Sequence, residues 1–488
     1  MEDLVLIKKR PTFGYSVLLL VTLAAMLIVG LTILKAPLAV VMFLAWLVVN
    51  LFAIKLGYTY KELEKIGIKQ VGKSLQSVVI MLAVGVLISS WIASGTVPTI
   101  IYYGLKIINP KYYLATTLII CAIVSMFTGT SWGTIGTVGV ALLGIGISMG
   151  INPGMVAGAL ISGSWFGDKL SPLSDTTNFQ SGVMGVPLMT HVKHMLYTTV
   201  PAFIISLILF LILGSGKSAD ADMQAVEVVG ESLKEFFTIS PITLIPLIVV
   251  VILLVKQRPA SQSILIGGVL GMILAVFYQK FDATLVLNSA LKGFEYDFKD
   301  EFLNTLLNRG GMDSMTRTIQ ALIFTTALGG MIRDMDILNV IIEPIGKKLK
   351  STFSLIFSAM FVDYLSIALT GSHMFGAIMV QSTMLDLFKK NKLKPENASR
   401  ISEDCGTLGV TLIPYGVTAM FIVDTLGIDF ETFVPFVFFC YISPLFNLVC
   451  AATGIGIARY TDEELEELER LEELEKLEEL EKLEMKEE

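Results

Sequence analysis

Two acidic residues, Asp168 and Asp175, stand at the end of an apolar segment beside a run of hydroxyl side chains; residues 163–178 read GSWFGDKLSPLSDTTN. An ionised side chain at the centre of a membrane helix costs about 2.5–3.5 kcal/mol, so such a residue usually marks an ion or proton pathway. Hard cations prefer carboxylate, hydroxyl and carbonyl oxygens. We therefore expect a cation site here. The neutral oxygens nearby belong to Ser171, Ser174, Thr176, Thr177 and Asn178.

A second polar break, TGTSWGT at residues 128–134, lies between two apolar segments of the same half. Irregular backbone at membrane depth is tolerated only where it is buried in protein or lines a polar cavity. The ends of interrupted helices hold ions in many transporters. Thr128, Thr130 and Ser131 are therefore further candidate ligands.

The second half of the chain carries its own intramembrane acids. Asp363 lies inside the apolar segment 353–369, and Glu403 and Asp404 precede a glycine. Thr370 and Ser372, which are further candidate ion ligands, border a break that also contains His373. The candidate proton carriers are Asp168, Asp175, Asp363 and His373. For each acid a structural ion pair is the alternative, for example between Asp168 and Lys169 or Arg400.

Such groups suit an exchanger. A partly desolvated carboxylate can hold either a cation or a proton near neutral pH, and competition at one site is enough for exchange. His191 and His194, three residues apart, have no third ligand close in sequence, so we interpret them as a surface pair and expect no metal beyond a transported cation. The sequence has no HExxH motif, and we do not expect an enzyme or a cofactor.

Composition places these residues in a membrane. Hydrophobic residues make up 54% of the chain, charged residues only 16%, and the mean hydropathy is +0.72. Apolar runs of about 20 residues recur, which is typical of a polytopic all-α membrane protein; we expect about 11–13 membrane segments. No nucleic-acid partner is expected. Four cysteines form no CxxC motif, which indicates reduced, buried thiols.

Lysines fix the expected orientation. Residues 1–14 contain Lys8, Lys9 and Arg10, and five lysines crowd residues 55–73. Positive charge collects on the cytoplasmic side. The N-terminus is therefore predicted to be cytoplasmic, and its first apolar run is interpreted as a span and not as a signal peptide.

The chain divides into two halves that align when it is shifted by 242 residues. Thr128, Gly129, Pro153, Gly167 and Pro172 then fall on Thr370, Gly371, Pro395, Gly409 and Pro414. Glycine and proline constrain backbone geometry, so we predict two pseudo-symmetric repeats with interrupted helices or re-entrant hairpins. The predicted parts are a first membrane half at 15–213 with its core at about 75–182, a linker at 214–238, a second half at 239–458 with its core at about 318–426, and a tail at 459–488.

The tail is acidic: residues 461–488 hold 15 acids and 4 bases, whereas the whole chain has a net charge of −7. Its leucines recur every third residue from Leu465 to Leu483, and at 3.6 residues per turn such a row winds around a helix. We predict a solvated single helix with Thr461 as its N-cap, without a role in transport.

The motifs resemble the NhaC-type sodium/proton antiporter family. The resemblance rests on TGTSWGT at 128–134, GSWFGDKLSPLSDTTN at 163–178, SGTVPTIIYYGL at 94–105 and SRISEDCGTLGVTLIPYG at 399–416. Where many relatives have Pro-Trp-Asn, this chain has Pro414-Tyr415-Gly416, so an amide ligand is not carried over to position 416.

The resemblance implies exchange of Na⁺ for H⁺ across a prokaryotic cell membrane, inverted repeats, elevator-like alternating access and a homodimer in membrane lipid. Some relatives exchange malate for lactate with the same ions, which is the alternative function. That alternative needs a cationic or N–H-rich pocket, for which Lys169, Arg400 and the N-termini of the half-helices are candidates.

Overall fold

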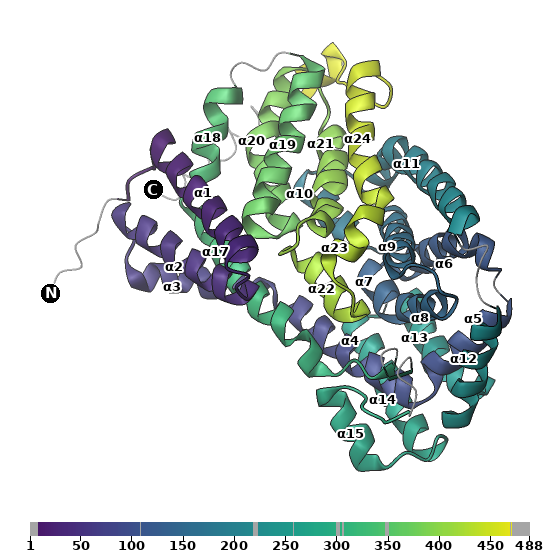
Figure 1. Ribbon diagram of the computed structural model, residues 1–488. Helices are drawn as coiled ribbons and strands as arrows, with labels where there is room; N and C mark the ends of the chain where they lie inside the picture. Colours follow the sequence, from purple (N-terminus) through teal and green to yellow (C-terminus); the bar gives the residue numbers. More distant parts are fainter. Residues whose placement is uncertain are drawn as a thin grey trace, which may run out of the picture.

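The computed structural model describes residues 8–107, 109–217, 223–256, 258–298, 303–304, 307–346, 351–468 and 470. Among them, regular structure is helical apart from one isolated β-bridge between Leu393 and Arg459 (Figure 1). In this part of the chain, seven helices are long and apolar enough to cross a membrane, or ten if each bent pair is one span. The predicted all-α polytopic membrane fold is confirmed; the figure of 11–13 segments stays a prediction.

The first half is a succession of helices joined by short turns. Its elements are α1 (Phe13–Ile28), α2 (Leu38–Lys55), α3 (Tyr60–Lys73), α4 (Leu75–Ala93), α5 (Thr96–Ile107), α6 (Tyr113–Thr128), α7 (Ser131–Thr134), α8 (Val140–Ser148), α9 (Pro153–Leu170), α10 (Asp175–Val183) and α11 (Leu188–Lys217). A π-helical turn at Ile135–Gly139 joins α7 to α8, so residues 131–148 form one apolar span.

The rest of the chain continues in the same way. Its helices are α12 (Met223–Phe236), α13 (Ile245–Val255), α14 (Ala260–Phe277), α15 (Ala283–Lys292), α17 (Thr316–Asp334), α18 (Ile337–Gly346), α19 (Thr352–Thr370), α20 (His373–Lys390), α21 (Pro395–Ile401), α22 (Val417–Leu426), α23 (Phe430–Phe433) and α24 (Phe438–Thr453). After α21 the chain passes through a π-helix, Ser402–Thr407, and a 3₁₀ turn, Gly409–Leu412.

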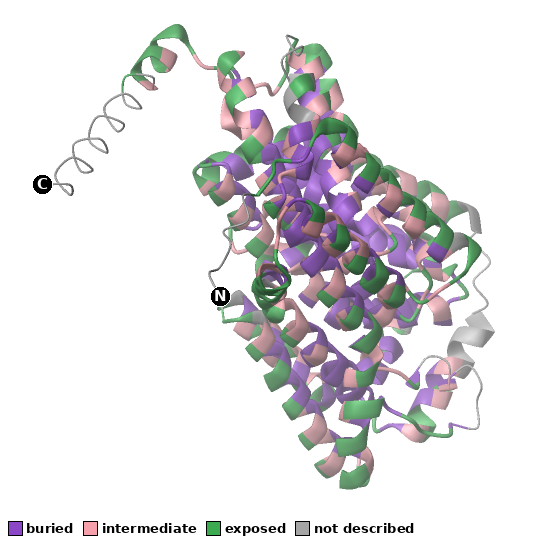
Figure 2. Ribbon diagram, turned by 90° about the vertical axis from the view of Figure 1, so that its left-hand side faces the viewer, coloured by how far each residue is buried: buried purple, intermediate pink, exposed green. Residues whose placement is uncertain are grey.

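The helices enclose two apolar cores. One gathers buried side chains of α4, α6, α8 and α9, and the other gathers those of α1, α2, α19 and α20. Close pairs are α6 with α9, α4 with α14, α2 with α17, α19 with α20, and α11 with α24. Buried residues run through the centre of the molecule and exposed residues form its outer surfaces (Figure 2). Residues 395–412 join the two cores, because Ile401 and Cys405 belong to one and Leu408 to the other.

One helix end and one helix start recur in the two halves at the 242-residue offset. Helices α6 and α19 end at Thr128 and Thr370, and each is followed by a left-handed glycine, Gly129 at φ 67° and Gly371 at φ 61°. A side chain at such a φ is strained, which explains the glycines. Helices α9 and α21 both begin at a proline in the first turn, where no amide donor is lost. This correspondence supports the predicted repeats; a symmetry relation in space stays a prediction.

The predicted linker at 214–238 contains a helix, α12, in its described part; residues 218–222 lie outside the described residues. In the tail, Thr461 caps a helix as predicted: its hydroxyl accepts from the Glu464 amide at 3.2 Å, and the Glu464 carboxylate accepts from the Thr461 amide at 2.9 Å. Residues 469 and 471–488, on which most of the leucine pattern falls, lie outside the described residues.

Candidate ion-translocation site

The two breaks of the first half lie against each other and place Asp168 between them. A Cβ at Gly129 would lie 2.8 Å from the carbonyl carbon of Leu173, so only glycine fits this close approach. After the break, Thr130 caps α7 by accepting from the Gly133 amide at 3.1 Å. The Ser131 amide, at the start of α7, donates to Asp168 Oδ2 at 3.0 Å. Asp168 is 3% exposed, and its second oxygen, Oδ1, has no hydrogen-bond partner among the described residues.

The polar side chains after Asp168 mostly serve the turn into α10. The Ser174 hydroxyl accepts from the Thr177 amide at 3.3 Å and lies 2.9 Å from the Thr176 hydroxyl. The Asn178 amide donates to the carbonyls of Pro172 and Ser174, and the Thr177 hydroxyl donates to the Lys169 carbonyl. Ser171 accepts from the Leu173 amide. Asp175 is exposed in the first turn of α10, where a negative charge is favourable.

Glu403 and Asp404, adjacent in the π-helix, face different partners. Asp404 is fully buried and forms an ion pair with Lys169 of α9. Ser443 donates to Asp404 Oδ1 at 2.6 Å and Asn447 to Oδ2 at 2.8 Å, both from α24. Arg400 Nε in turn donates to Asn447 at 3.0 Å. Asp404 is thus held in a closed network that ties α9 to α24, and Lys169 pairs with it instead of with Asp168.

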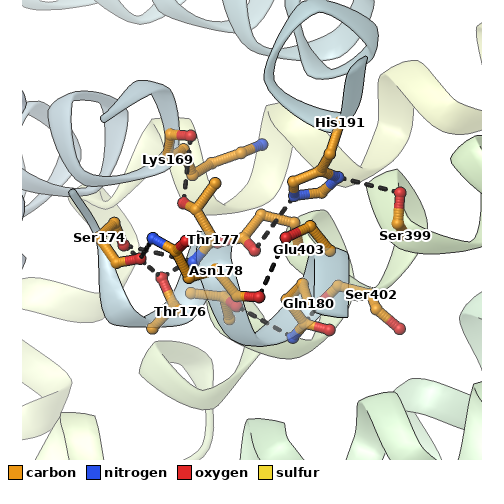
Figure 3. A network of polar contacts seen from close by, with 12 residues as sticks. Lys169, Ser174, Thr176, Thr177, Asn178, Gln180, His191, Ser399, Ser402 and Glu403 are labelled. Atoms are coloured by element: carbon orange, nitrogen blue, oxygen red, sulfur yellow. Dashed lines mark hydrogen bonds and ion pairs between the residues drawn. The ribbon is translucent and has the colours of Figure 1, made fainter. Parts of the chain in front are cut away.

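Glu403 points to the opposite side, toward α10 and α11 (Figure 3). Thr176 donates to Glu403 Oε1 at 3.3 Å, and His191 Nε2 lies 3.8 Å from Glu403 Oε2. Gln180 of α10 donates to the Ser402 carbonyl at 3.4 Å, which fixes the π-helix against α10. Both Glu403 and His191 are fully buried.

Asp363 of α19 is the carboxylate of the site with the fewest hydrogen bonds among the described residues. It is fully buried, and neither of its oxygens has a hydrogen-bond partner in the part of the chain that the structure describes. Two glycines make room for it: a Cβ on Gly406 would lie 3.1 Å from both oxygens, and one on Gly376 of α20 would clash with Oδ1. Glu403 is the charged neighbour that Asp363 and Asp168 share.

A cavity of about 160 Å³ opens beside the break between α19 and α20. Thr370, Ser372 and His373 line it, and His373 Nε2 has no partner among the described residues. Gln70 and Trp132 of the first half and Arg333 of α17 line it as well, so polar groups of both halves border the cavity. The Thr128 hydroxyl lies 3.4 Å from that of Thr134, at the corresponding break of the first half.

The structure brings Asp168, Asp363 and Glu403 into one neighbourhood and leaves Asp175 exposed. The interpretation of His191 and His194 as a surface pair is wrong, because α11 packs against residues 395–401 and buries both imidazoles. Gln180, Ser443 and Asn447 were also missed. A polar residue inside an otherwise apolar helix was the available signal for Ser443 and Asn447.

Residues 129–133, Gly-Thr-Ser-Trp-Gly, have the G-x-S-x-G spacing of a nucleophile elbow. In hydrolases this motif joins a strand to a helix. Here it joins α6 to α7, and the Ser131 amide contacts a carboxylate. The spacing therefore describes a helix break in this chain.

Comparison with known proteins agrees with this architecture. A family model described as "Na+/H+ antiporter family" matches residues 3–174 and 163–455. The chain is 36% identical to the Na⁺/H⁺ antiporter NhaC of Alkalihalophilus pseudofirmus over 93% of its own length and 98% of that protein. It is 36% identical to the malate-2H⁺/Na⁺-lactate antiporter of Bacillus subtilis over 91% and 96%. It is 28% identical to the arginine/ornithine antiporter ArcD of Halobacterium salinarum over 94% and 96%. On these matches, the chain belongs to the Na⁺/H⁺ antiporter family.

Proposed function

We propose that this protein exchanges Na⁺ for H⁺ across a prokaryotic cell membrane, with its N-terminus in the cytoplasm. The observation that carries the proposal is that Oδ1 of Asp168 and both oxygens of Asp363 are buried and have no hydrogen-bond partner within the described residues. A buried, unpaired carboxylate is costly unless it binds a cation or a proton. Because Na⁺ and H⁺ would bind to the same oxygen, each excludes the other there. This competition couples the flux of Na⁺ to the flux of H⁺.

Asp168 and Asp363 are the proposed Na⁺ ligands. Asp168 lies where two helix breaks meet, next to the hydroxyls of Ser131 and Ser174. Asp363 lies next to the π-helix Ser402–Thr407. Asp404 is less suited to this role because its carboxylate oxygens already bond to Lys169, Ser443 and Asn447. Elevator-like motion and a homodimer in lipid stay predictions from the family resemblance.

Sodium-coupled exchange of a carboxylate is the second candidate. Lys169 and Arg400, the cations expected to bind such a substrate, are committed to buried polar networks. Arg333 also pairs with a carboxylate, that of Asp334 at 2.7 Å, but it lines the cavity together with Gln70 and the start of α20. A guanidinium and free helix amides are suitable groups for a carboxylate.

The test is ΔpH-driven ²²Na⁺ uptake into proteoliposomes, repeated with malate and with lactate. We expect uptake without an organic acid. The Asp168→Asn variant should lose at least about 100-fold, equivalent to about 2.7 kcal/mol, because it removes the charge that binds either ion. Asp386→Asn, at an exposed position on α20, is the matched control. Uptake that requires malate or lactate would favour the second candidate, and wild-type uptake by Asp168→Asn would place the site elsewhere.

A further inference from the structure

His191 makes one short contact that fixes which of its nitrogens carries a hydrogen. Its Nδ1 lies 2.9 Å from the Ser399 hydroxyl (Figure 3). The Ser399 oxygen in turn lies 3.1 Å from the Glu396 carbonyl. A carbonyl only accepts, so we assign the single hydroxyl hydrogen of Ser399 to the bond with the Glu396 carbonyl. The Ser399 oxygen then accepts from Nδ1–H of His191. In neutral His191, Nε2 is therefore left with a lone pair.

That lone pair faces a second acceptor. Nε2 lies 3.8 Å from Glu403 Oε2, both side chains are fully buried, and neither atom has a hydrogen-bond partner within the described part of the chain. Two buried acceptors that face each other without a hydrogen between them lose their hydration and gain nothing in exchange. One bound proton converts this arrangement into a charge-assisted contact.

We propose that Glu403 and His191 together bind one proton, and that this pair is a proton site distinct from the carboxylates that bind Na⁺. The inference rests on the proposed Na⁺/H⁺ exchange. Uptake of the proton needs no other reactant: it binds between Oε2 and Nε2, and the charge of the pair rises by one.

The charged groups around the pair explain how its protonation affects Na⁺ binding at the Asp168 and Asp363 oxygens. The charged or titratable groups packed nearby are Asp168 and Lys169 on α9, His194 on α11, Asp363 on α19, His373 on α20, and Arg400 and Asp404 in residues 395–412. Lys169 and Asp404 neutralise each other. Glu403 remains the negative neighbour common to Asp168 and Asp363, so protonation of the pair weakens Na⁺ binding at both. By linkage, bound Na⁺ favours release of the proton.

Histidine NMR tests the proton site without transport. The chain has three histidines, so ¹⁵N-histidine labelling gives three pairs of signals, and the His191→Gln variant assigns one pair. We expect His191 Nδ1 to carry a hydrogen at every pH, and Nε2 to gain a proton or hydrogen bond that is lost at high pH. A neutral His191 with hydrogen on Nε2 and none on Nδ1 would overturn the inference.

The second measurement is the pH dependence of Na⁺ binding to the full chain in detergent. In the wild type, the half-saturating Na⁺ concentration should rise on acidification, by up to about tenfold per pH unit for each proton that opposes Na⁺ binding. Glu403→Gln and His191→Gln should each flatten this dependence. The controls are Glu431→Gln, at an exposed site on α23, and His194→Gln, one turn from His191. An unchanged slope in both site variants would contradict the proposal, whereas the absence of Na⁺ flux in the wild type would contradict Na⁺/H⁺ exchange itself.

Discussion

Residues 153–170 and 395–412 occupy matching places in the two halves and begin alike at a proline, but they differ in backbone and in chemistry. The first is one continuous α-helix with Asp168 and Lys169 in its last turn. The second changes from α-helix to π-helix to 3₁₀ turn and carries Glu403 and Asp404 in the π-helix. Single π-turns inside α-helices are frequent at functional sites.

The difference shows how two segments that begin alike can serve different roles. Side chains adjacent on a helix project about 100° apart, which lets Asp404 face α9 and α24 while Glu403 faces α10 and α11. Asp404 closes an ion pair with Lys169 of the other segment, so the two segments are tied together. Asp168 and Glu403 remain with unpaired oxygens. One pair of charges holds the segments in place, and the remaining acids are available to ions.

The largest expected effect comes from breaking the tie between the segments. Lys169→Met leaves Asp404 buried without its partner, and loss of one partner of a buried pair costs about 3–5 kcal/mol. We expect the free energy of unfolding in mixed micelles to fall by this amount. The double variant Lys169→Met with Asp404→Leu should recover most of it, because no unpaired charge remains. Lys69→Met, at an exposed site on α3, is the control; an equal loss in the double variant would show that the pair does more than balance charge.

An intermediate effect is expected at Asp363, a buried acid that belongs to the second half of the chain. Asp363→Asn keeps the shape of the side chain but cannot ionise. The half-saturating Na⁺ concentration for exchange should rise at least about tenfold, equivalent to about 1.4 kcal/mol, and the pH dependence of exchange should flatten. Flux at graded Na⁺ and pH in proteoliposomes measures both. Unchanged Na⁺ affinity and an unchanged pH profile would make Asp363 a structural residue.

The smallest effect is expected from the contact between the tail and residues 391–394, which precede α21. In the described structure, the residues before α9 make no corresponding contact. Lys392 and Lys394 pair with Asp462 and Glu464 at the surface. Exposed pairs contribute up to about 1 kcal/mol each, so deletion of residues 462–488 should leave the flux per protein unchanged. Flux measured against the amount of folded protein tests this. A large loss of flux in a well-folded truncation would show that the tail acts on α21.

Much of this molecule was predictable from local sequence. Apolar run lengths predicted the helical membrane fold, and the Thr-Gly pairs at 128–129 and 370–371 predicted the two helix ends. Asp168 and Asp363 were predicted as buried acids, because an acid in an apolar run has few alternatives to a polar interior. The burial of His191 was not predictable in this way, since it depends on which helix covers α11.

The sequence by itself determined the membrane environment, the positions of the breaks and the identity of the acids, since these follow from hydropathy and from the backbone limits of glycine and proline. Only the tertiary structure decided which acid is paired and which is free. Glu403 and Asp404 are neighbours in sequence, yet Lys169 neutralises Asp404, which also accepts from Ser443, while His191 and Thr176 border Glu403. The reason is physical: the state of a buried carboxylate depends on the donors within a few ångströms, and Lys169 and Thr176 come from helices more than 200 residues away along the chain.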